Sequence, residues 1–289
     1  MCYNNLMNTK IKDIRPSPIA GAWYPGNPQK LRTSVEGYLA EADTPTLQGE
    51  VLGLVVPHAG HIYSGPVAAC AFNAVRGRSY DSVLIVSPSH QYYREPILTS
   101  AHQSYATPLG TVEIDRQAVN AIDRHLLGNL GFGLTPVAYD EEHSLEIELP
   151  FLQVALETSF TLIPIMLRDQ SPKTARALAE AIAAQVKGQN TLLVASSDLS
   201  HFHTETQANK LDQAILDQVA ALDPDGLYRV MADGRGEACG LGPIAALLWA
   251  AKELGAEHAA VIRHATSAAV TGDRSSVVGY GAAIITRSA

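Results

Sequence analysis

Cysteine and positive charge are scarce in this sequence. Its 289 residues include three cysteines, and 21 lysines and arginines stand against 29 aspartates and glutamates, which gives a net charge of −8. An odd, sparse set of cysteines does not fit a disulfide framework, so it indicates a reducing compartment and predicts a cytoplasmic protein. The chain also has no basic run, so we expect neither a nucleic acid nor an anionic membrane as partner.

Long hydrophobic runs and several common motifs are missing as well. The apolar run Leu241–Ala251 is no longer than a buried helix, so no segment is expected to span a bilayer. The chain has no internal repeat, Walker-type phosphate loop or Gly-x-Ser-x-Gly motif. Residues 1–13 are polar and do not resemble a signal peptide. We therefore expect a loose leader over residues 1–13, followed by a single domain over residues 14–289.

Apolar runs of strand length alternate with segments of helical periodicity. Four runs without polar alternation predict strands that are buried on both faces: Val51–Pro57, Ser82–Ser87, Phe160–Leu167 and Thr191–Ser196. Helices are predicted at Gln29–Glu41, Gly65–Arg76, Asp115–Leu127, Ser144–Glu157, Pro172–Val186, Thr206–Leu222 and Gly242–Leu254. We expect two final strands at Ala259–Ala265 and Val277–Thr286, and a hairpin within Pro96–Val112. This order predicts an α/β domain with a central, largely parallel sheet covered by helices.

Polar clusters directly follow three of the predicted strands. They are Pro57–His61, Ser87–His90 and Ser196–His201. In open α/β sheets, ligands bind at the carboxyl ends of the strands, so parallel strands place all three clusters on one rim. Imidazole is the commonest metal ligand, and loops on a rigid scaffold often carry such ligands. Together, His58 and His90 predict a mononuclear metal site, although each alone also fits a hydrogen-bonded loop histidine.

Two further residues precede predicted helices. His143 is expected at a helix N-terminus, where the helix dipole disfavours the imidazolium and a neutral ring can donate a hydrogen bond to a substrate. Its alternative role is capping and packing. Cys239 precedes another apolar helix, a position that predicts a lowered thiol pKa and a soft metal ligand. The alternative for Cys239 is packing in the core, which we expect for Cys70.

Five motifs, in this order along the chain, resemble the Memo family. They are Pro-His-Ala-Gly-His-Ile-Tyr-Ser-Gly from Pro57, Pro-Ser-His from Pro88, Glu-Glu-His-Ser-Leu-Glu from Glu141, Ser-Ser-Asp-Leu-Ser-His from Ser196, and Cys-Gly at Cys239. The similarity extends over residues 14–287. It implies a fold related to the class III extradiol ring-cleaving dioxygenases, which hold a non-haem iron with two histidines and a carboxylate.

The resemblance also implies roles for individual residues. His58 and His90 match the two histidine ligands, and Cys239 matches the cysteine that Memo-like proteins carry as the third ligand. Asp198, His201 and His143 match polar residues that line the pocket. A cysteine in place of the carboxylate admits copper as well as iron and argues against catechol ring cleavage. In prokaryotes the resemblance further implies association with a radical-SAM system protein.

These expectations lead to one main hypothesis and two alternatives. The main one is a metal-dependent oxidoreductase that uses iron or copper, with His201 as acid or base, Asp198 orienting His201 or a metal-bound water, and His143 on the opposite wall. A zinc-dependent hydrolase is the first alternative, with His201 as its base. The second is a non-catalytic adaptor that holds a metal or a peptide. In each case the pocket takes a small-molecule or peptide ligand.

Overall fold

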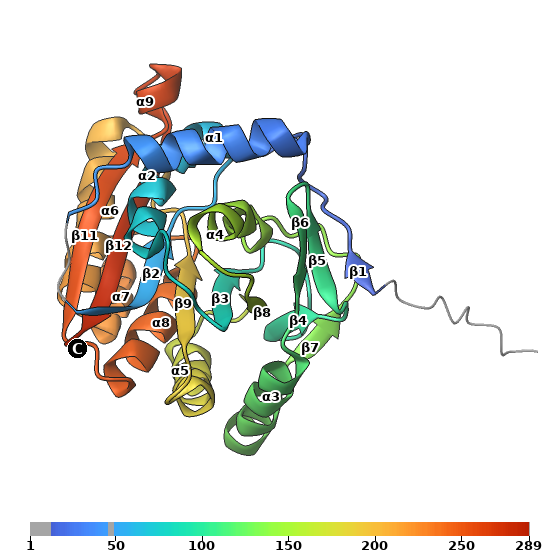
Figure 1. Cartoon of the computed structure of the whole chain (residues 1–289). Coiled ribbons are helices and arrows are strands. Elements are labelled where there is room, and N and C mark those ends of the chain that lie inside the picture. Colours follow the sequence, from blue (N-terminus) through green and yellow to red (C-terminus); the bar gives the residue numbers. More distant parts are fainter. Residues whose placement is uncertain (1–12, 46–48, 289) are drawn as a thin grey trace, which may run out of the picture.

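The computed structural model describes residues 13–45 and 49–288, so Cys2 and nearly all of the predicted leader lie outside the described residues. The strands are β1 Ile14–Arg15, β2 Glu50–Val56, β3 Ser82–Pro88, β4 Ile97–Ser100, β5 Ser104–Thr107, β6 Gly110–Glu113, β7 Thr135–Val137, β8 Thr161–Leu167, β9 Thr191–Ser196, β10 His201–His203, β11 His258–Thr266 and β12 Val277–Arg287. Within the described ranges, nine of them form one sheet in the order β10-β12-β2-β9-β3-β8-β4-β7, with β11 paired to β12 (Figure 1). The other three form a small sheet, β1-β5-β6.

The centre of the large sheet is parallel. Strand β9 pairs in parallel with β2 on one side and with β3 on the other, and β3 pairs in parallel with β8. These four strands are the four apolar runs of the sequence, so the prediction of a helix-covered parallel core is confirmed. The strands beyond them turn antiparallel, at β12 against β2 and at β4 against β8. The predicted hairpin is present as β5 and β6, while β4 joins the large sheet.

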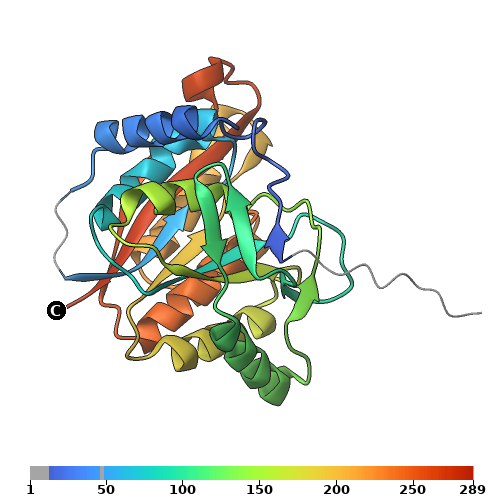
Figure 2. The ribbon, with the colours of Figure 1, turned by 45° about the vertical axis from the view of Figure 1, so that its right-hand side comes forward.

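Helices cover both faces of this sheet. They are α1 Pro28–Glu41, α2 His61–Phe72, α3 Arg116–Leu130, α4 Leu149–Ala155, α5 Pro172–Val186, α6 Glu205–Ala220, α7 Pro224–Ala232, α8 Leu241–Glu253 and α9 Ala268–Thr271, with short 3-10 turns at Asn73–Val75 and Glu146–Glu148. Figures 1 and 2 show α1, α2 and α4 on one side of the sheet and α3, α5 and α8 on the other. No helix in the described parts of the chain is both long and apolar enough to cross a membrane.

Side-chain caps fix several helix starts. Asn27 and Ser171 accept backbone N–H groups at the starts of α1 and α5, and in both helices proline is the first residue. Helix α2 differs from prediction, because it begins at His61 and contains Pro66 in its interior. Proline ordinarily stands in the first turn of a helix, and the predicted start at Gly65 would have given Pro66 that position. As predicted, Cys70 is buried in α2.

Candidate metal centre

The ends of the three central strands bring the predicted clusters together. His58 lies two residues beyond Val56, the last residue of β2, and His90 lies two beyond Pro88, the last residue of β3. Asp198 holds the same position after β9, the strand between them. The convergence that the sequence predicted from parallel strands is therefore present in the fold.

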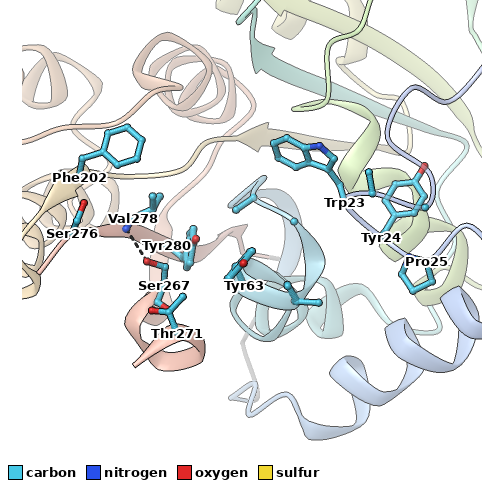
Figure 3. Close-up of a pocket in the computed structure, with 15 residues that line it drawn as sticks. Trp23, Tyr24, Pro25, Tyr63, Phe202, Ser267, Thr271, Ser276, Val278 and Tyr280 are labelled. Atoms are coloured by element: carbon cyan, nitrogen blue, oxygen red, sulfur yellow. Dashed lines mark hydrogen bonds between the residues drawn. The ribbon is translucent and has the colours of Figure 1, made fainter. Parts of the chain in front are cut away.

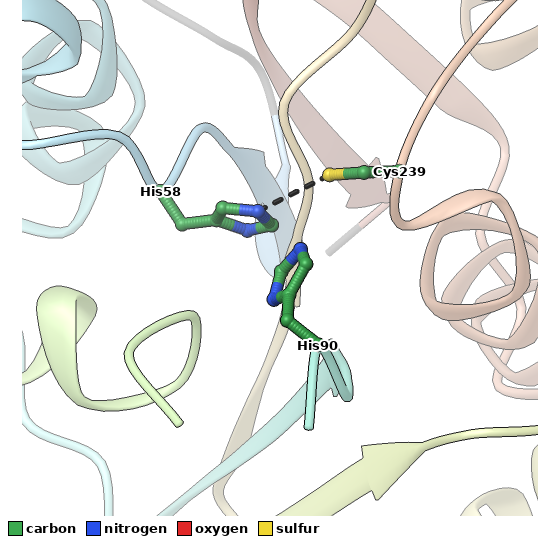
Figure 4. Close-up of side chains that lie close together, drawn as sticks. All are labelled: His58, His90 and Cys239. Carbon is green, nitrogen blue, oxygen red and sulfur yellow. Dashed lines mark hydrogen bonds between the residues drawn. The ribbon is translucent and has the colours of Figure 1, made fainter. Parts of the chain in front are cut away.

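Three potential ligands converge at this rim. Ligand atoms of His58, His90 and Cys239 all lie within 4.8 Å of one another, and Cys239 Sγ lies 3.1 Å from His58 Nε2 (Figure 4). Cys239 reaches the rim from the segment before α8, where its N–H donates to the carbonyl oxygen of Asp198 at 3.2 Å. The next residue has to be glycine, because a Cβ on Gly240 would lie 2.6 Å from the carbonyl oxygen of Ser196.

A buried carboxylate orients His90. Glu142 Oε1 lies 2.9 Å from His90 Nδ1, and Glu142 Oε2 accepts the backbone N–H of His90 at 2.5 Å. Burial alone raises the pKa of Glu142, but the hydrogen bonds that its carboxylate accepts from His90 and from the Ser144 N–H outweigh this effect and hold the pKa well below its usual range. An ionised Glu142 accepts the Nδ1–H of His90 and leaves Nε2 available to a metal.

A hydroxyl and a second carboxyl orient His58. The Ser196 hydroxyl lies 2.9 Å from His58 Nδ1, 2.6 Å from the carbonyl oxygen of Ser144 and 2.8 Å from Glu148 Oε1. Burial raises the pKa of Glu148 well above its usual range, so this carboxyl is protonated and donates to Ser196. The single hydroxyl hydrogen of Ser196 is directed to the carbonyl, and its oxygen accepts the Nδ1–H of His58. This tautomer leaves the His58 Nε2 lone pair facing Cys239.

A buried arginine holds the loop that carries Glu142. Arg15, on β1, lies 2.7 Å from Asp140 and 2.5 Å from Glu146, and it donates to the carbonyl oxygen of Glu142 at 2.9 Å. Arg15, Asp140 and Glu146 are all buried, so each charge depends on its partner. This network connects β1 to the loop whose Glu142 orients His90.

The imidazoles of His58 and His143, which are more buried than that of His90, are neutral. Burial lowers the pKa of His58 well below its usual range, and the neighbouring rings of His143 and His90 lower it further. Burial also lowers the pKa of His143 to about 4, with partial compensation by Glu142. Neutral imidazole is the form that binds a metal, so His58 needs no deprotonation at neutral pH.

The thiol behaves differently from what its sequence position predicted. The place of Cys239 before α8 predicted a lowered pKa, but burial, and then the charge of Asp198, raise the pKa of the thiol well above its usual range. The prediction was wrong because desolvation of the thiolate outweighs the dipole of the helix. In the metal-free protein the thiol is therefore protonated, and a bound cation has to displace its proton.

The three predicted pocket residues lie around the ligands. The ring of His143 lies 4.7 Å from that of His90 and 5.5 Å from that of His58, measured between centroids. Asp198 Oδ1 accepts the backbone N–H groups of His58, at 2.7 Å, and Ala59. His201 turns its Nδ1 to the carbonyl oxygen of Leu199 at 2.9 Å, and burial lowers the pKa of its ring. Asp198 thus orients the His58 turn, whereas the sequence placed it against His201 or a water.

His90, Glu142 and His143 form a second group with ligand-like spacing. Here, however, the oxygens of Glu142 accept the N–H groups of His90, His143 and Ser144 in addition to the His90 side chain. Glu142 is therefore committed to supporting the loop. The first group, with two supported imidazoles and a thiol, fits a single transition-metal ion better.

Comparison with known proteins identifies the family. A sequence profile described as Memo-like protein matches residues 15–284. The chain belongs to the Memo-like family. MEMO1 family proteins of Nitrosopumilus maritimus, Methanopyrus kandleri and Methanococcoides burtonii are 33%, 36% and 37% identical to this Memo-like chain over 273, 283 and 274 residues. The alignments cover 93%, 94% and 94% of the chain and 98%, 99% and 100% of the relatives. An uncharacterized protein from Escherichia coli K12 has a solved structure that matches with a TM-score of 0.49 and 11% identity, over 81% of this chain and 100% of that one.

The sequence did not reveal which residues orient the candidate metal ligands of this Memo-like protein. Glu142 was visible as the neighbour of His143, and Ser196 as the last residue of a predicted strand. Glu148, however, lies in a predicted helix with no sign that its carboxyl faces Ser196, which is 48 residues away. Such long-range partners depend on tertiary packing, which a single sequence does not reveal.

Proposed function

We propose that this Memo-like protein is an oxidoreductase that depends on one non-haem iron or copper ion held by His58, His90 and Cys239. The observation that carries the proposal is the convergence of three ligand atoms within 4.8 Å, with both imidazoles supported at Nδ1. A soft thiolate beside two imidazoles suits iron and copper, and zinc is the alternative. When bound, iron or copper would supply redox chemistry at this site.

The surrounding residues supply proton transfer and binding. His201 Nδ1–H donates to the carbonyl oxygen of Leu199, which leaves Nε2 as the basic nitrogen, and burial lowers the pKa of the ring, so it is neutral at neutral pH and available as a base. Burial raises the pKa of Asp198 to about 7, so this carboxyl exchanges a proton near neutral pH while it holds the His58 turn. His143, which is neutral, forms the adjoining wall and binds substrate by hydrogen bonding.

The test is metal content by elemental mass spectrometry. The protein is purified anaerobically without a His-tag, together with the variants His58→Ala, Cys239→Ala and Cys70→Ala. Cys70 is the matched control, because it is the other free cysteine of the described residues and lies in α2. We expect about one iron or copper per chain in the wild type and in Cys70→Ala, and loss of the metal in the other two variants.

The outcomes separate the competing functions. Iron or copper that supports O2 consumption with candidate reductants favours the oxidoreductase. Stoichiometric zinc with oxygen-independent turnover contradicts it and favours a hydrolase. No metal after anaerobic loading also contradicts it and favours a binding module on this scaffold.

A further inference from the structure

A cavity of about 740 Å³ lies beside the candidate metal centre. Three parts of the chain line it: residues 21–25 before α1, residues 59, 60, 62 and 63 at the start of α2, and a wall from β10, β12 and the α9 region. In Figure 3, Tyr63 and Tyr280 lie between Trp23 and Phe202. The volume of the cavity falls within the range of pockets that hold small organic molecules.

Stacked rings connect this cavity to the candidate ligands. The Trp23 ring stacks on His143 at 4.2 Å between centroids, and His143 stacks in turn on His90 at 4.7 Å. Ala59, which lines the cavity, directly follows His58 in the chain. At the other end, the ring of Phe202 meets that of His201 at 5.7 Å. The stacked rings of Trp23 and His143 thus lie between the cavity and His90.

The lining of the cavity carries no charge. All fifteen of the described residues around it are apolar, aromatic, glycine or hydroxyl-bearing, although the whole chain has 29 acidic and 21 basic residues. An ionised ligand placed there loses water without gaining a counter-ion, which is unfavourable. Hydroxyls such as those of Tyr63, Ser276 and Tyr280 offer a few hydrogen bonds to a neutral polar group. The lining therefore selects against charged ligands.

Two exposed hydrophobic side chains line the same cavity. Phe202 is 77% exposed and Ile62 is 59% exposed. Phe202 also has a φ of 63°, in the left-handed region that favours glycine, at a register shift between His201 and His203. An exposed ring on strained backbone gains little from packing within the chain. Strain of this kind clusters at ligand-binding sites, and here it presents an aromatic face to the cavity.

We propose that this cavity binds an uncharged organic molecule with a flat aromatic or hydrophobic ring system, held between Trp23 and Phe202. This inference rests on the proposed function, because it names the substrate class of the same site. The ring system occupies the cavity, and the stacked rings of Trp23 and His143 lie between it and the candidate ligand His90. Hydroxyl groups of the lining orient any neutral polar substituent.

The test uses two fluorescent probes that differ by one charge. N-phenyl-1-naphthylamine is uncharged, and 8-anilinonaphthalene-1-sulfonate has the same ring system with an added sulfonate. Titrated into the metal-free full chain, the uncharged probe is expected to bind at least about tenfold more tightly, because the sulfonate has no counter-charge in the cavity. Equal affinities, tighter binding of the sulfonate, or no saturable binding of the uncharged probe overturns the proposal.

Two pairs of variants locate the binding. Phe202→Ala is expected to weaken the uncharged probe by about tenfold, whereas Tyr92→Ala, which removes an 81% exposed aromatic outside the cavity lining, leaves it unchanged. Ile62→Lys is expected to raise the affinity for the sulfonate probe by supplying a counter-charge, and Leu127→Lys on α3 is not. If each cavity variant behaves like its control, the proposal is wrong.

The same experiment distinguishes failure of this inference from failure of the proposed function. Probe binding is measured without metal, and metal content is measured separately. Selective binding of the uncharged probe in a protein that never takes up metal refutes the oxidoreductase and supports the ligand class. Metal uptake without selective probe binding refutes the ligand class alone.

Discussion

The rim of the parallel strands and the cavity beside it are built in opposite ways. At the rim, Nδ1 of both His58 and His90 has a hydrogen-bond partner, and the supporting carboxyls Glu142 and Glu148 are buried. The cavity wall instead exposes Ile62 and an aromatic ring on strained backbone, and its lining carries no charge. A metal ion requires donors in fixed positions, whereas a neutral ring requires apolar area. We propose that this fold places ion binding at the strand ends and ligand recognition in the loops that face them.

The largest expected effect comes from breaking the network that anchors the rim. Replacing Arg15 by leucine leaves Asp140 and Glu146 buried without a counter-charge, so Arg15→Leu is expected to lower the free energy of unfolding by about 3–5 kcal/mol. Arg235→Leu, which breaks an exposed pair with Asp233, is expected to cost less than about 1 kcal/mol. Chemical denaturation measures both. Equal costs contradict the idea that buried charge pairing holds the rim.

The next largest effect is expected on metal affinity, when the carboxylate that supports His90 is removed. Glu142→Gln removes the charge that orients Nδ1–H and is expected to weaken metal binding by about 10- to 100-fold. Glu141→Gln changes the exposed neighbour and is expected to have no effect. Competition titration with a chelator measures the two affinities. If they agree, Glu142 has no role in holding the metal ligand.

Metal binding should depend on pH through Cys239. Because its pKa is raised well above the usual range, the thiol is protonated at neutral pH and has to release its proton when a cation binds. We expect about one proton released per metal and an affinity that rises about tenfold per pH unit near neutrality. Calorimetry in buffers of different ionisation enthalpy measures the release. Any residual binding by Cys239→Ala is expected to lack this proton, and an unchanged release in that variant excludes the thiol as its source.

The smallest effect is expected on the cavity side. Phe202→Gly removes an exposed ring and suits the positive φ, while glycine adds entropy to the unfolded chain. These contributions oppose each other, so the free energy of unfolding is expected to change by less than about 1 kcal/mol. Phe151→Ala, in the buried core, is expected to cost about 3–5 kcal/mol in the same thermal or chemical unfolding assay. A comparable loss in Phe202→Gly indicates a structural role for the ring instead.

The sequence predicted the strand ends better than it predicted what surrounds them. Uninterrupted apolar runs marked β2, β3, β8 and β9, because strands buried on both faces need no polar alternation. The turns that follow therefore pointed to His58 and His90. Helix α7 was missed, although Asp223 caps it and Pro224 begins it, which are recognisable start signals.

The residues that orient His58 and His90, and the cavity beside them, could not be predicted from the sequence. A glutamate in a helical pattern reads as a solvated residue, yet Glu148 is buried against Ser196 because of the way the 3-10 turn before α4 packs on the end of β9. Nothing near Phe202 signals an exposed ring, since its conformation comes from the pairing of β10 with β12. The pKa of Cys239 was mispredicted for the same reason, because burial is a tertiary property.

X-ray absorption spectroscopy of the metal-loaded protein tests the central claim most directly. If His58, His90 and Cys239 hold one ion, the wild-type spectrum contains one sulfur neighbour and the imidazole scattering of two histidines. Cys239→Ala, where it still takes up metal, is expected to lose the sulfur neighbour, and Cys70→Ala is expected to keep it. A wild-type metal shell of nitrogen and oxygen alone contradicts the assignment of this site.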